Sequence, residues 1–117
     1  MAHLRGKLDV LSLTTSEEPV FLPLVALGEL YKGALASSRP AANIRLVDDF
    51  LLIAALLYPD SATAQSYAQA SLGLSRKGRP IPENDIWIAA VALECEMPLA
   101  TRDEHFSEVE GLQIIRW

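Results

Sequence analysis

The sequence has little cysteine, little histidine and no long hydrophobic run, and each shortage excludes a class of protein. A single cysteine, Cys95, occurs among 117 residues, so the chain cannot form an internal disulfide. The longest apolar run extends from Phe50 to Tyr58, which is far too short for a transmembrane helix. No apolar signal-peptide core lies between Met1 and Asp9. We therefore expect a soluble cytoplasmic protein.

The scarce reactive side chains have ordinary structural interpretations. Cys95 lies within an apolar segment, so we expect a buried structural thiol rather than a nucleophile. His3 is close to the N-terminus, and His105 is next to Phe106, where a surface or packing role is expected rather than a ligand role. The chain also has no Gly-rich phosphate-binding loop. Thiol catalysis and phosphate-loop chemistry are therefore disfavoured.

Basic residues are outnumbered by acidic ones. The chain has 10 Lys and Arg against 15 Asp and Glu, which gives a net charge of −5. Such a protein is a poor general binder of the nucleic-acid backbone, because affinity for phosphates comes largely from Lys and Arg. Two features can reverse this locally: a basic patch, or a metal cation that neutralises a group of acids.

Apolar material is plentiful, and its pattern predicts the fold class. Half of the residues are hydrophobic and 21% are charged, which suits a single domain over residues 1–117. Strand-like runs alternate with helical periods, which is typical of an α/β protein with a parallel sheet covered on both faces. The expected strands are Val20–Leu22, the apolar run ending at Tyr58 (or the end of a helix there), "MPLAT" and "GLQIIRW". The expected helices run from about Leu24 to Ala36, from Pro40, from Asp60 or Ser61 to about Arg76, and from Glu83 to Glu96, with a loop or short helix in "RDEHFSEV".

Three acids differ from the others, which read as solvated surface. Glu29 lies in an apolar helical segment that also contains two glycines, Gly28 and Gly33, although pairing with Lys32 on one helix edge is an equal alternative. Asp85 falls in the first turn of an apolar helix, where acids also serve as caps. The apolar helix around Trp87 and Ile88 fits burial within the domain better than a dimer interface. Asp103 follows the "PLAT" strand, where it can cap the next turn or lie at the sheet edge that binds ligands.

These acids lie on separate elements and can converge at one strand edge. Carboxylates that are forced together repel, and a divalent cation relieves that repulsion. Oxygen ligands suit Mg2+ or Mn2+, and Mg2+ also binds phosphate oxygens. Such a site activates water and stabilises charge on a phosphodiester.

Two segments carry a resemblance to a known family. The segments "FLPLVALGELYKGALASSRP" and "SRKGRPIPENDIWIAAVALECEMPLATRDEHFSEVEGLQII", with their spacing, closely resemble PIN-domain ribonucleases of the VapC toxin type. The resemblance covers nearly the whole chain from Val20 onward. It implies a three-layer α/β/α domain that binds Mg2+ or Mn2+ through a cluster of acids and cleaves RNA. It also implies a homodimer and a cognate antitoxin as partners.

The resemblance assigns roles to individual residues. It implies that Glu29, Asp85 and Asp103 bind the metal and form the catalytic centre, with Asn84 and Thr101 as supporting polar neighbours. It also implies contacts to the RNA backbone from basic residues near the site, although a solvated loop is an equal interpretation for them. These are Arg76, Lys77, Arg79 and Arg102.

One departure from the family concerns the N-terminal region. The family begins with a strand that ends in an Asp-Thr-Asn type motif, and this chain has none; "MAHLRGKLDVLSL" instead resembles the helix that follows. We expect the first strand and first acid to be missing. Asp9 is a weaker substitute, because the segment from Val10 to Pro19 is shorter than a parallel crossover needs. A catalytically impaired module that binds antitoxin or RNA is the alternative function. If the chain folds alone, its own N-terminal segment or a partner must fill the gap in the sheet.

Overall fold

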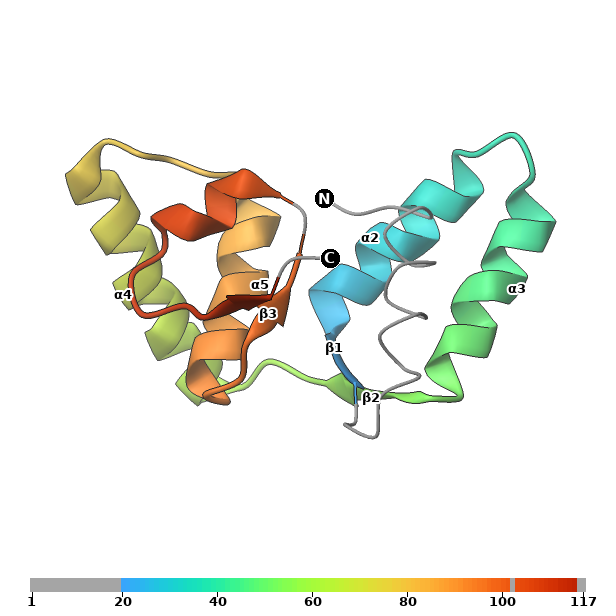
Figure 1. Ribbon diagram of the computed structural model, residues 1–117, viewed down its shortest axis with the longest axis horizontal. Coiled ribbons are helices and arrows are strands. Elements are labelled where there is room, and N and C mark those ends of the chain that lie inside the picture. The colour runs from blue at the N-terminus through green and yellow to red at the C-terminus, as the bar shows by residue number, and fades with distance from the viewer. Residues whose placement is uncertain (1–19, 102, 116–117) are drawn as a thin grey trace. The chain divides into compact units, whose positions relative to one another are not determined.

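The computed structural model describes residues 20–101 and 103–115, and these combine helices with parallel strands (Figure 1). The chain divides into two compact units, one up to Leu57 and one from Tyr58 onward. The predicted α/β class is confirmed. The predictions about the N-terminal segment, including Asp9, His3 and the missing first strand, lie outside the described residues.

The first unit pairs two strands in parallel and covers them with two helices. Its elements are β1 (Val20–Pro23), α2 (Leu24–Leu35), α3 (Pro40–Leu51) and β2 (Ala54–Leu57). In the register of β1 and β2, Val20 lies opposite Ala54 and Pro23 opposite Leu57. Pro40 occupies the first turn of α3, where its missing N–H costs nothing. Of the two forms predicted for residues 52–58, the structure has the strand, because α3 ends at Leu51 and β2 follows it; β2 is partly exposed rather than buried as predicted.

The core of the first unit comes from the facing sides of α2 and α3. Leu27, Leu30 and Ala34 of α2 are buried, and so are Val47 and Phe50 of α3. These three residues of α2 recur at spacings of three and four, which places them on one helical face, and Ala26 of the same helix is buried as well. Burying that face, rather than helix propensity alone, holds α2 in place.

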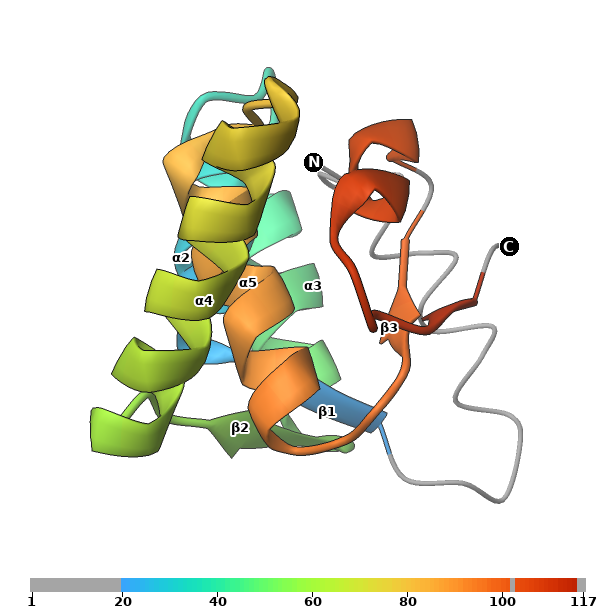
Figure 2. The same ribbon diagram turned by 90° about the vertical axis from the view of Figure 1, so that its left-hand side faces the viewer.

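The second unit contains a helix pair and a second parallel pair of strands. Its elements are α4 (Ser61–Lys77), α5 (Glu83–Glu94), β3 (Leu99–Ala100), the 3-10 helix η1 (Glu104–Glu108) and β4 (Ile114–Ile115). Leu99 lies opposite Ile114 in the parallel register of β3 and β4. Figure 2 shows α4 and α5 side by side. No helix within the described ranges is long and apolar enough to cross a membrane.

Helix α4 is capped at both of its ends. The Asp60 side chain accepts a hydrogen bond from Thr63 N at 3.1 Å, and Thr63 Oγ1 accepts one from Asp60 N at 3.0 Å. This reciprocal pair is a capping box, with Asp60 as the predicted cap. At the other end Gly78 adopts a left-handed conformation with φ 66°, which glycine reaches without a steric penalty.

Helix α5 is buried on almost every side and is the apolar centre of the second unit. Its buried apolar side chains are Ile86, Ile88, Ala89, Ala90, Val91 and Ala92. A helix that is apolar all round is a core helix. It ends at Glu94, two residues before the predicted end, because Glu96 takes a positive φ of 53° and Met97 N bonds back to Ala92 O. Pro82 is the N-cap residue and lies just before the first turn of α5.

Candidate metal centre

Asp85 lies at the third position of α5, where the sequence places a carboxylate at the positive end of a helix. Pro82 begins the turn, and its carbonyl accepts a hydrogen bond from Asp85 N at 3.0 Å. The residue is only 2% exposed, and it is the one acidic residue in the buried class among those described. The helix dipole favours a negative charge at this point. The dipole alone is a modest compensation for burying a carboxylate, so a further partner is expected.

Asp103 reaches the same region from the end of β3. Thr101 anchors the segment because its N–H donates to Ile115 O at 3.0 Å, which extends the ladder between β3 and β4. The Thr101 hydroxyl, in a residue 5% exposed, accepts a hydrogen bond from Asp103 N at 3.0 Å. Thr101 therefore fixes the backbone that carries Asp103. The supporting role of Thr101 in the site stays a prediction.

His105 is the third member of the group, and it comes from η1. Its Nε2 lies 2.6 Å from Asp85 Oδ2. The neighbouring residue Phe106 is 1% exposed and anchors η1 in the core. The rings of His105 and Phe106 lie 5.1 Å apart between centroids, with a tilt of 42°. The buried Phe106 thus positions the half-buried imidazole next to Asp85.

Asp85, Asp103 and His105 together form a donor set of the kind that holds a divalent cation. Each offers one ligand atom, and these atoms lie within 4.8 Å of one another. Asp85 Oδ2 contacts His105, whereas Oδ1 is buried with no hydrogen-bond partner among the described residues. A buried carboxylate oxygen is rarely left in this state unless a ligand, ion or water meets it. The two carboxylates and the imidazole therefore fit a divalent cation both in their positions and in the chemistry of their donor atoms.

The structure brings together two of the three predicted metal ligands. Asp85 and Asp103 belong to the second unit and share the cluster. Glu29 is half-buried on α2 in the first unit, so its part in the site stays a prediction. Asn84 precedes Asp85 and is exposed, and its supporting role likewise stays a prediction.

The predicted RNA-contacting residues lie near the end of α4. Arg76, Lys77 and Arg79 are exposed, and Lys77 is engaged with Glu108, whose carboxylate lies 3.9 Å away and whose carbonyl accepts a hydrogen bond from it. Arg102 lies outside the described residues. The predicted loop is therefore wrong for Arg76 and Lys77, which lie in the last turn of α4, whereas Arg79 follows the helix; the contacts of Arg76 and Arg79 with RNA stay a prediction.

His105 is the cluster member that sequence reasoning missed. The sequence contains the pattern Asp103-x-His105, but an adjacent apolar Phe106 made a packing role the simpler interpretation. The decisive fact is tertiary, because η1 carries His105 back to a residue twenty positions earlier in the chain. A histidine two residues after a predicted ligand was the available signal.

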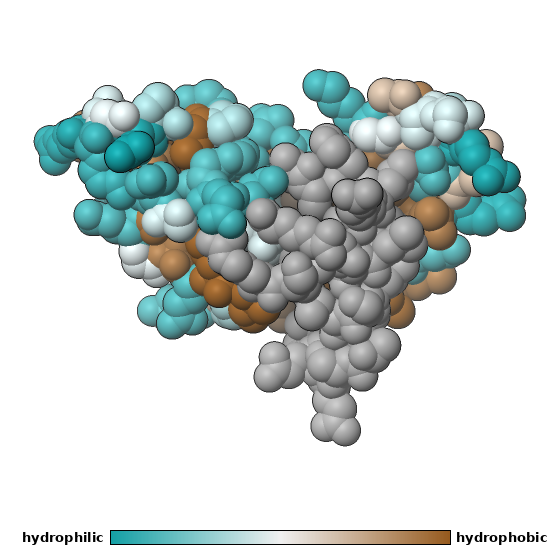
Figure 3. Space-filling model, turned by 45° about the horizontal axis from the view of Figure 1, so that its top comes forward, coloured by the Kyte–Doolittle hydropathy of each residue, from teal (hydrophilic) through white to brown (hydrophobic). Residues whose placement is uncertain are grey.

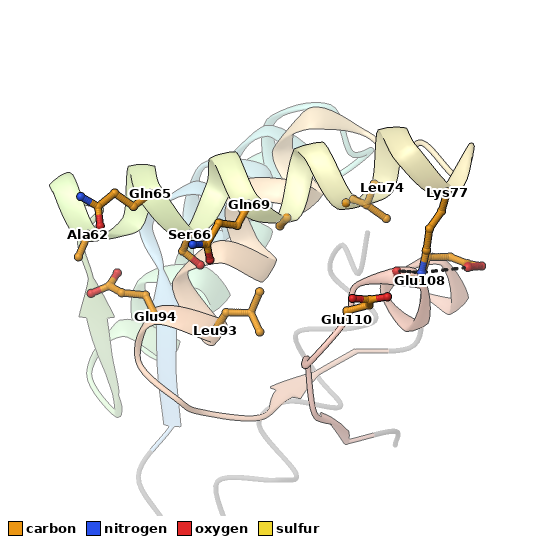
Figure 4. A pocket seen from close by; sticks show the side chains of 12 residues that line it. Ala62, Gln65, Ser66, Gln69, Leu74, Lys77, Leu93, Glu94, Glu108 and Glu110 are labelled. Carbon is orange, nitrogen blue, oxygen red and sulfur yellow. Dashed lines mark hydrogen bonds and ion pairs between the residues drawn. The ribbon is translucent and has the colours of Figure 1, made fainter.

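A separate hollow of about 530 Å³ lies in the second unit, away from the metal cluster residues (Figure 4). Its wall carries Gln65, Ser66 and Gln69 of α4 together with the acids Glu94, Glu108 and Glu110. None of Asp85, Asp103 and His105 lines it. Polar and apolar side chains contribute about equally to its lining, and the hollow is partly open to solvent, unlike a closed apolar ligand site.

Cys95 does not offer a nucleophile. Burial, and then the nearby charges of Glu94 and Asp60, raise the pKa of its thiol. A raised pKa leaves less thiolate at neutral pH, and the thiolate is the reactive form. Cys95 is partly exposed rather than buried as predicted, but its unreactive character agrees with the sequence interpretation.

Several large apolar side chains of the described residues are exposed. On the face drawn in Figure 3 hydrophilic residues predominate, and hydrophobic residues show as separate areas. The most exposed large apolar side chains of the described residues include Leu52 at 83% and Tyr58 at 67%. Scattered exposed apolar residues are normal for proteins and require no functional explanation.

Comparison with known proteins identifies the family. Residues 4–112 match the PIN domain. The chain belongs to the PIN domain family. It is 31% identical to ribonuclease VapC1 of Haemophilus influenzae over 97 residues, which cover 82% of this chain and 72% of the relative.

Solved structures of PIN-domain complexes resemble this chain in fold. VapBC-1 from nontypeable Haemophilus influenzae is 27% identical, with a TM-score of 0.79, covering 97% of this chain and 85% of that one. VapBC-5 from Mycobacterium tuberculosis, described as a member of the VapBC family of toxin-antitoxin systems, is 31% identical, with a TM-score of 0.72 and coverage of 81% and 79%. The predicted family, PIN-domain proteins of the VapC type, is confirmed.

Proposed function

We propose that this PIN-domain protein is a metal-dependent endoribonuclease of the VapC toxin type. The observation that carries the proposal is that Asp85, Asp103 and His105 lie close together. One buried oxygen of Asp85 has no hydrogen-bond partner among the described residues, so it is available to a ligand. The similarity to ribonuclease VapC1 supplies the reaction class, hydrolysis of RNA. The cluster supplies the means, because carboxylates grouped in this way hold a divalent cation.

Asp85 and Asp103 hold Mg2+ or Mn2+ in this proposal, and Glu29 is the third acid. When bound, the ion supplies stabilisation of negative charge on the phosphodiester and activation of water. Helix α5 fixes the backbone of Asp85, and Thr101 fixes the backbone of Asp103, which limits the reorganisation needed to receive the ion. Such preorganisation is what makes charge stabilisation effective.

The RNA backbone is held by basic residues in this proposal. Arg76 and Arg79 at the end of α4, with Arg102 beside Asp103, offer positive charge to phosphates in a protein whose net charge is −5. Lys77 contributes less than these, because Glu108 already pairs with it. Neutralising the acid cluster with a cation further favours the approach of RNA.

A cognate antitoxin and a second copy of the chain are the proposed protein partners. Two of the structures that resemble this chain are VapBC assemblies, and one of these is described as part of a toxin-antitoxin system. An impaired module that binds antitoxin or RNA is the second candidate function, because the 117 residues contain no Asp-Thr-Asn motif. A site that lacks one of its acids binds a metal less tightly and positions water less well.

RNA cleavage separates the two candidate functions. The full chain is incubated with single-stranded RNA and Mg2+ or Mn2+, alongside Asp85→Asn, which keeps the side-chain shape and removes the charge. We expect cleavage by the parent chain and a loss of about 100-fold or more in Asp85→Asn, because the cation loses a principal ligand. Asp49→Asn, at an exposed position on α3, is the matched control and should cleave normally. Equal background cleavage by parent and Asp85→Asn would leave the binding module as the function.

A further inference from the structure

His105 is the one member of the cluster to which the proposed function assigns no role of its own. Its side chain is 35% exposed, whereas the side chain of Asp85 is 4% exposed, so the imidazole borders the solvent side of a buried carboxylate. The ring is held by Asp85 Oδ2 at 2.6 Å and by the buried Phe106 ring. A side chain fixed in this way loses little more freedom when it binds a ligand.

We infer that His105 is a nitrogen ligand of the cation at Asp85 and Asp103, and that the site therefore prefers Mn2+ and later first-row divalent ions to Mg2+. The inference rests on the proposed function, since both require a cation at this cluster. It adds a ligand that carboxylate chemistry alone does not suggest, and it favours one class of ion over another.

Two observations support the inference independently of each other. The first is geometric: a ring nitrogen of His105 and one oxygen of each acid lie within 4.8 Å, close enough to meet one ion. The second is the state of Asp85, a residue 2% exposed whose Oδ1 is buried with no hydrogen-bond partner among the described residues. That oxygen belongs to the same carboxylate that His105 contacts through Oδ2.

The chemical consequence follows from the preferences of the two donor types. Mg2+ is a hard ion that takes oxygen ligands and keeps several waters. Imidazole nitrogen suits transition-metal ions, whose affinity for a mixed nitrogen and oxygen site rises from Mn2+ through Co2+ and Ni2+. Replacing one oxygen or water by His105 thus strengthens the binding of Mn2+ and Co2+ more than that of Mg2+. A site of acids alone would discriminate much less.

The test measures metal binding to the full chain without RNA. Mn2+ is titrated and its free concentration is followed by electron paramagnetic resonance, and Mg2+ affinity is measured by competition. We expect tighter binding of Mn2+ than of Mg2+, and 14N modulation of the bound Mn2+ signal in pulsed measurements. In His105→Gln, which keeps a polar group near Asp85, we expect Mn2+ affinity to fall about tenfold or more, little change for Mg2+, and loss of the 14N modulation.

The chain offers a matched control because it has only two histidines. His3→Gln should bind Mn2+ as the parent does and should keep the 14N modulation. Mn2+ bound without 14N modulation in the parent would overturn the inference, and so would modulation that persists in His105→Gln. An equal fall of Mg2+ and Mn2+ affinity in His105→Gln would also overturn it, because His105 would then act only by positioning Asp85.

The outcomes for His105 and for the nuclease activity are separable. Cleavage that depends on Asp85, combined with no nitrogen signal, leaves the proposed function intact and rejects the histidine ligand. A nitrogen signal without RNA cleavage supports the ligand and rejects the nuclease. A parent chain that binds no Mn2+ at millimolar concentration contradicts the inference directly.

Discussion

Helices α4 and α5 lie side by side in the second unit, yet they are stabilised in different ways. Seven residues of the shorter α5 are buried, against two in α4. Helix α4 instead has a capping box at its start and a left-handed glycine at its end, whereas the cap residue of α5 makes no side-chain hydrogen bond. Helix α4 is stabilised mainly by capping at its two ends, whereas α5 is stabilised mainly by the burial of its side chains. A helix held by packing on all sides can carry a buried acid such as Asp85 without losing its position.

The two helices meet through a few specific contacts. The rings of Tyr67 and Trp87 stack with 4.0 Å between centroids, and Ser66 Oγ donates to Ala90 O at 3.0 Å. Tyr67 also donates to Glu83, and this hydrogen bond is the main cause that raises the pKa of the Tyr67 phenol. Trp87 is therefore engaged within the second unit, which agrees with the intradomain role expected for this segment.

Removing packing from α5 should have the largest effect on stability. Ile88→Ala truncates a side chain that is 3% exposed, and we expect the free energy of unfolding to fall by about 2–5 kcal/mol. Leu72→Ala is the matched change on α4, where the side chain is 49% exposed, and it should alter stability by less than about 0.5 kcal/mol. Urea unfolding followed by tryptophan fluorescence measures both. Similar losses in the two variants would contradict the contrast between the helices.

Changing the glycines of the α4 region should have a smaller effect, with opposite signs at two positions. Gly78→Ala forces a side chain into the left-handed region at φ 66°, and we expect a loss of about 1–2 kcal/mol. Gly73→Ala lies within the helix, where an added Cβ would meet nothing within 4 Å, and we expect a gain of up to about 1 kcal/mol. Thermal unfolding of both variants measures the difference. The same sign for both would show that α4 does not depend on its C-terminal cap.

The smallest expected effect concerns Cys95, which follows the end of α5. Burial first, and then Glu94 and Asp60, raise the pKa of the thiol above its ordinary value of 9.0. Because the thiolate is the form that reacts, alkylation by iodoacetamide should reach half its maximal rate above pH 9.0. Glu94→Gln removes a negative neighbour and should move that midpoint to lower pH, while Glu110→Gln should leave it unchanged. An alkylation midpoint below pH 9.0 in the parent chain would contradict the raised pKa of Cys95.

Much of the fold could be predicted because its signals are local. Pro40, Asp60 and Pro82 mark helix starts by their own backbone or side-chain chemistry, and α3, α4 and α5 begin within one residue of the expected points. Within the described residues, β3 and β4 are two residues long each, shorter than the apolar runs "MPLAT" and "GLQIIRW" suggest. An apolar run shows that a segment is buried, whereas the number of paired residues depends on the neighbouring strand.

The candidate site was less accessible from the sequence. Asp85 and Asp103 were selected because each carboxylate lies at the end of an apolar element. The contact between His105 and Asp85 has no local sequence signal, because it joins η1 to α5. The buried Phe106 holds η1 in the core next to this contact. The family resemblance identified the two acids as metal ligands. The place of His105 in the cluster follows only from the tertiary structure.

The half-satisfied carboxylate of Asp85 has a consequence for the stability of the whole chain. A buried polar atom without a partner costs about 1–3 kcal/mol, and here that atom is Oδ1 of a residue in the first turn of the core helix. Any ligand that occupies this oxygen in the folded chain, and not in the unfolded one, raises the melting temperature through linkage. The ligand-free chain would then be the form most open to unfolding and proteolysis. Its persistence in a cell would depend on the supply of that ligand.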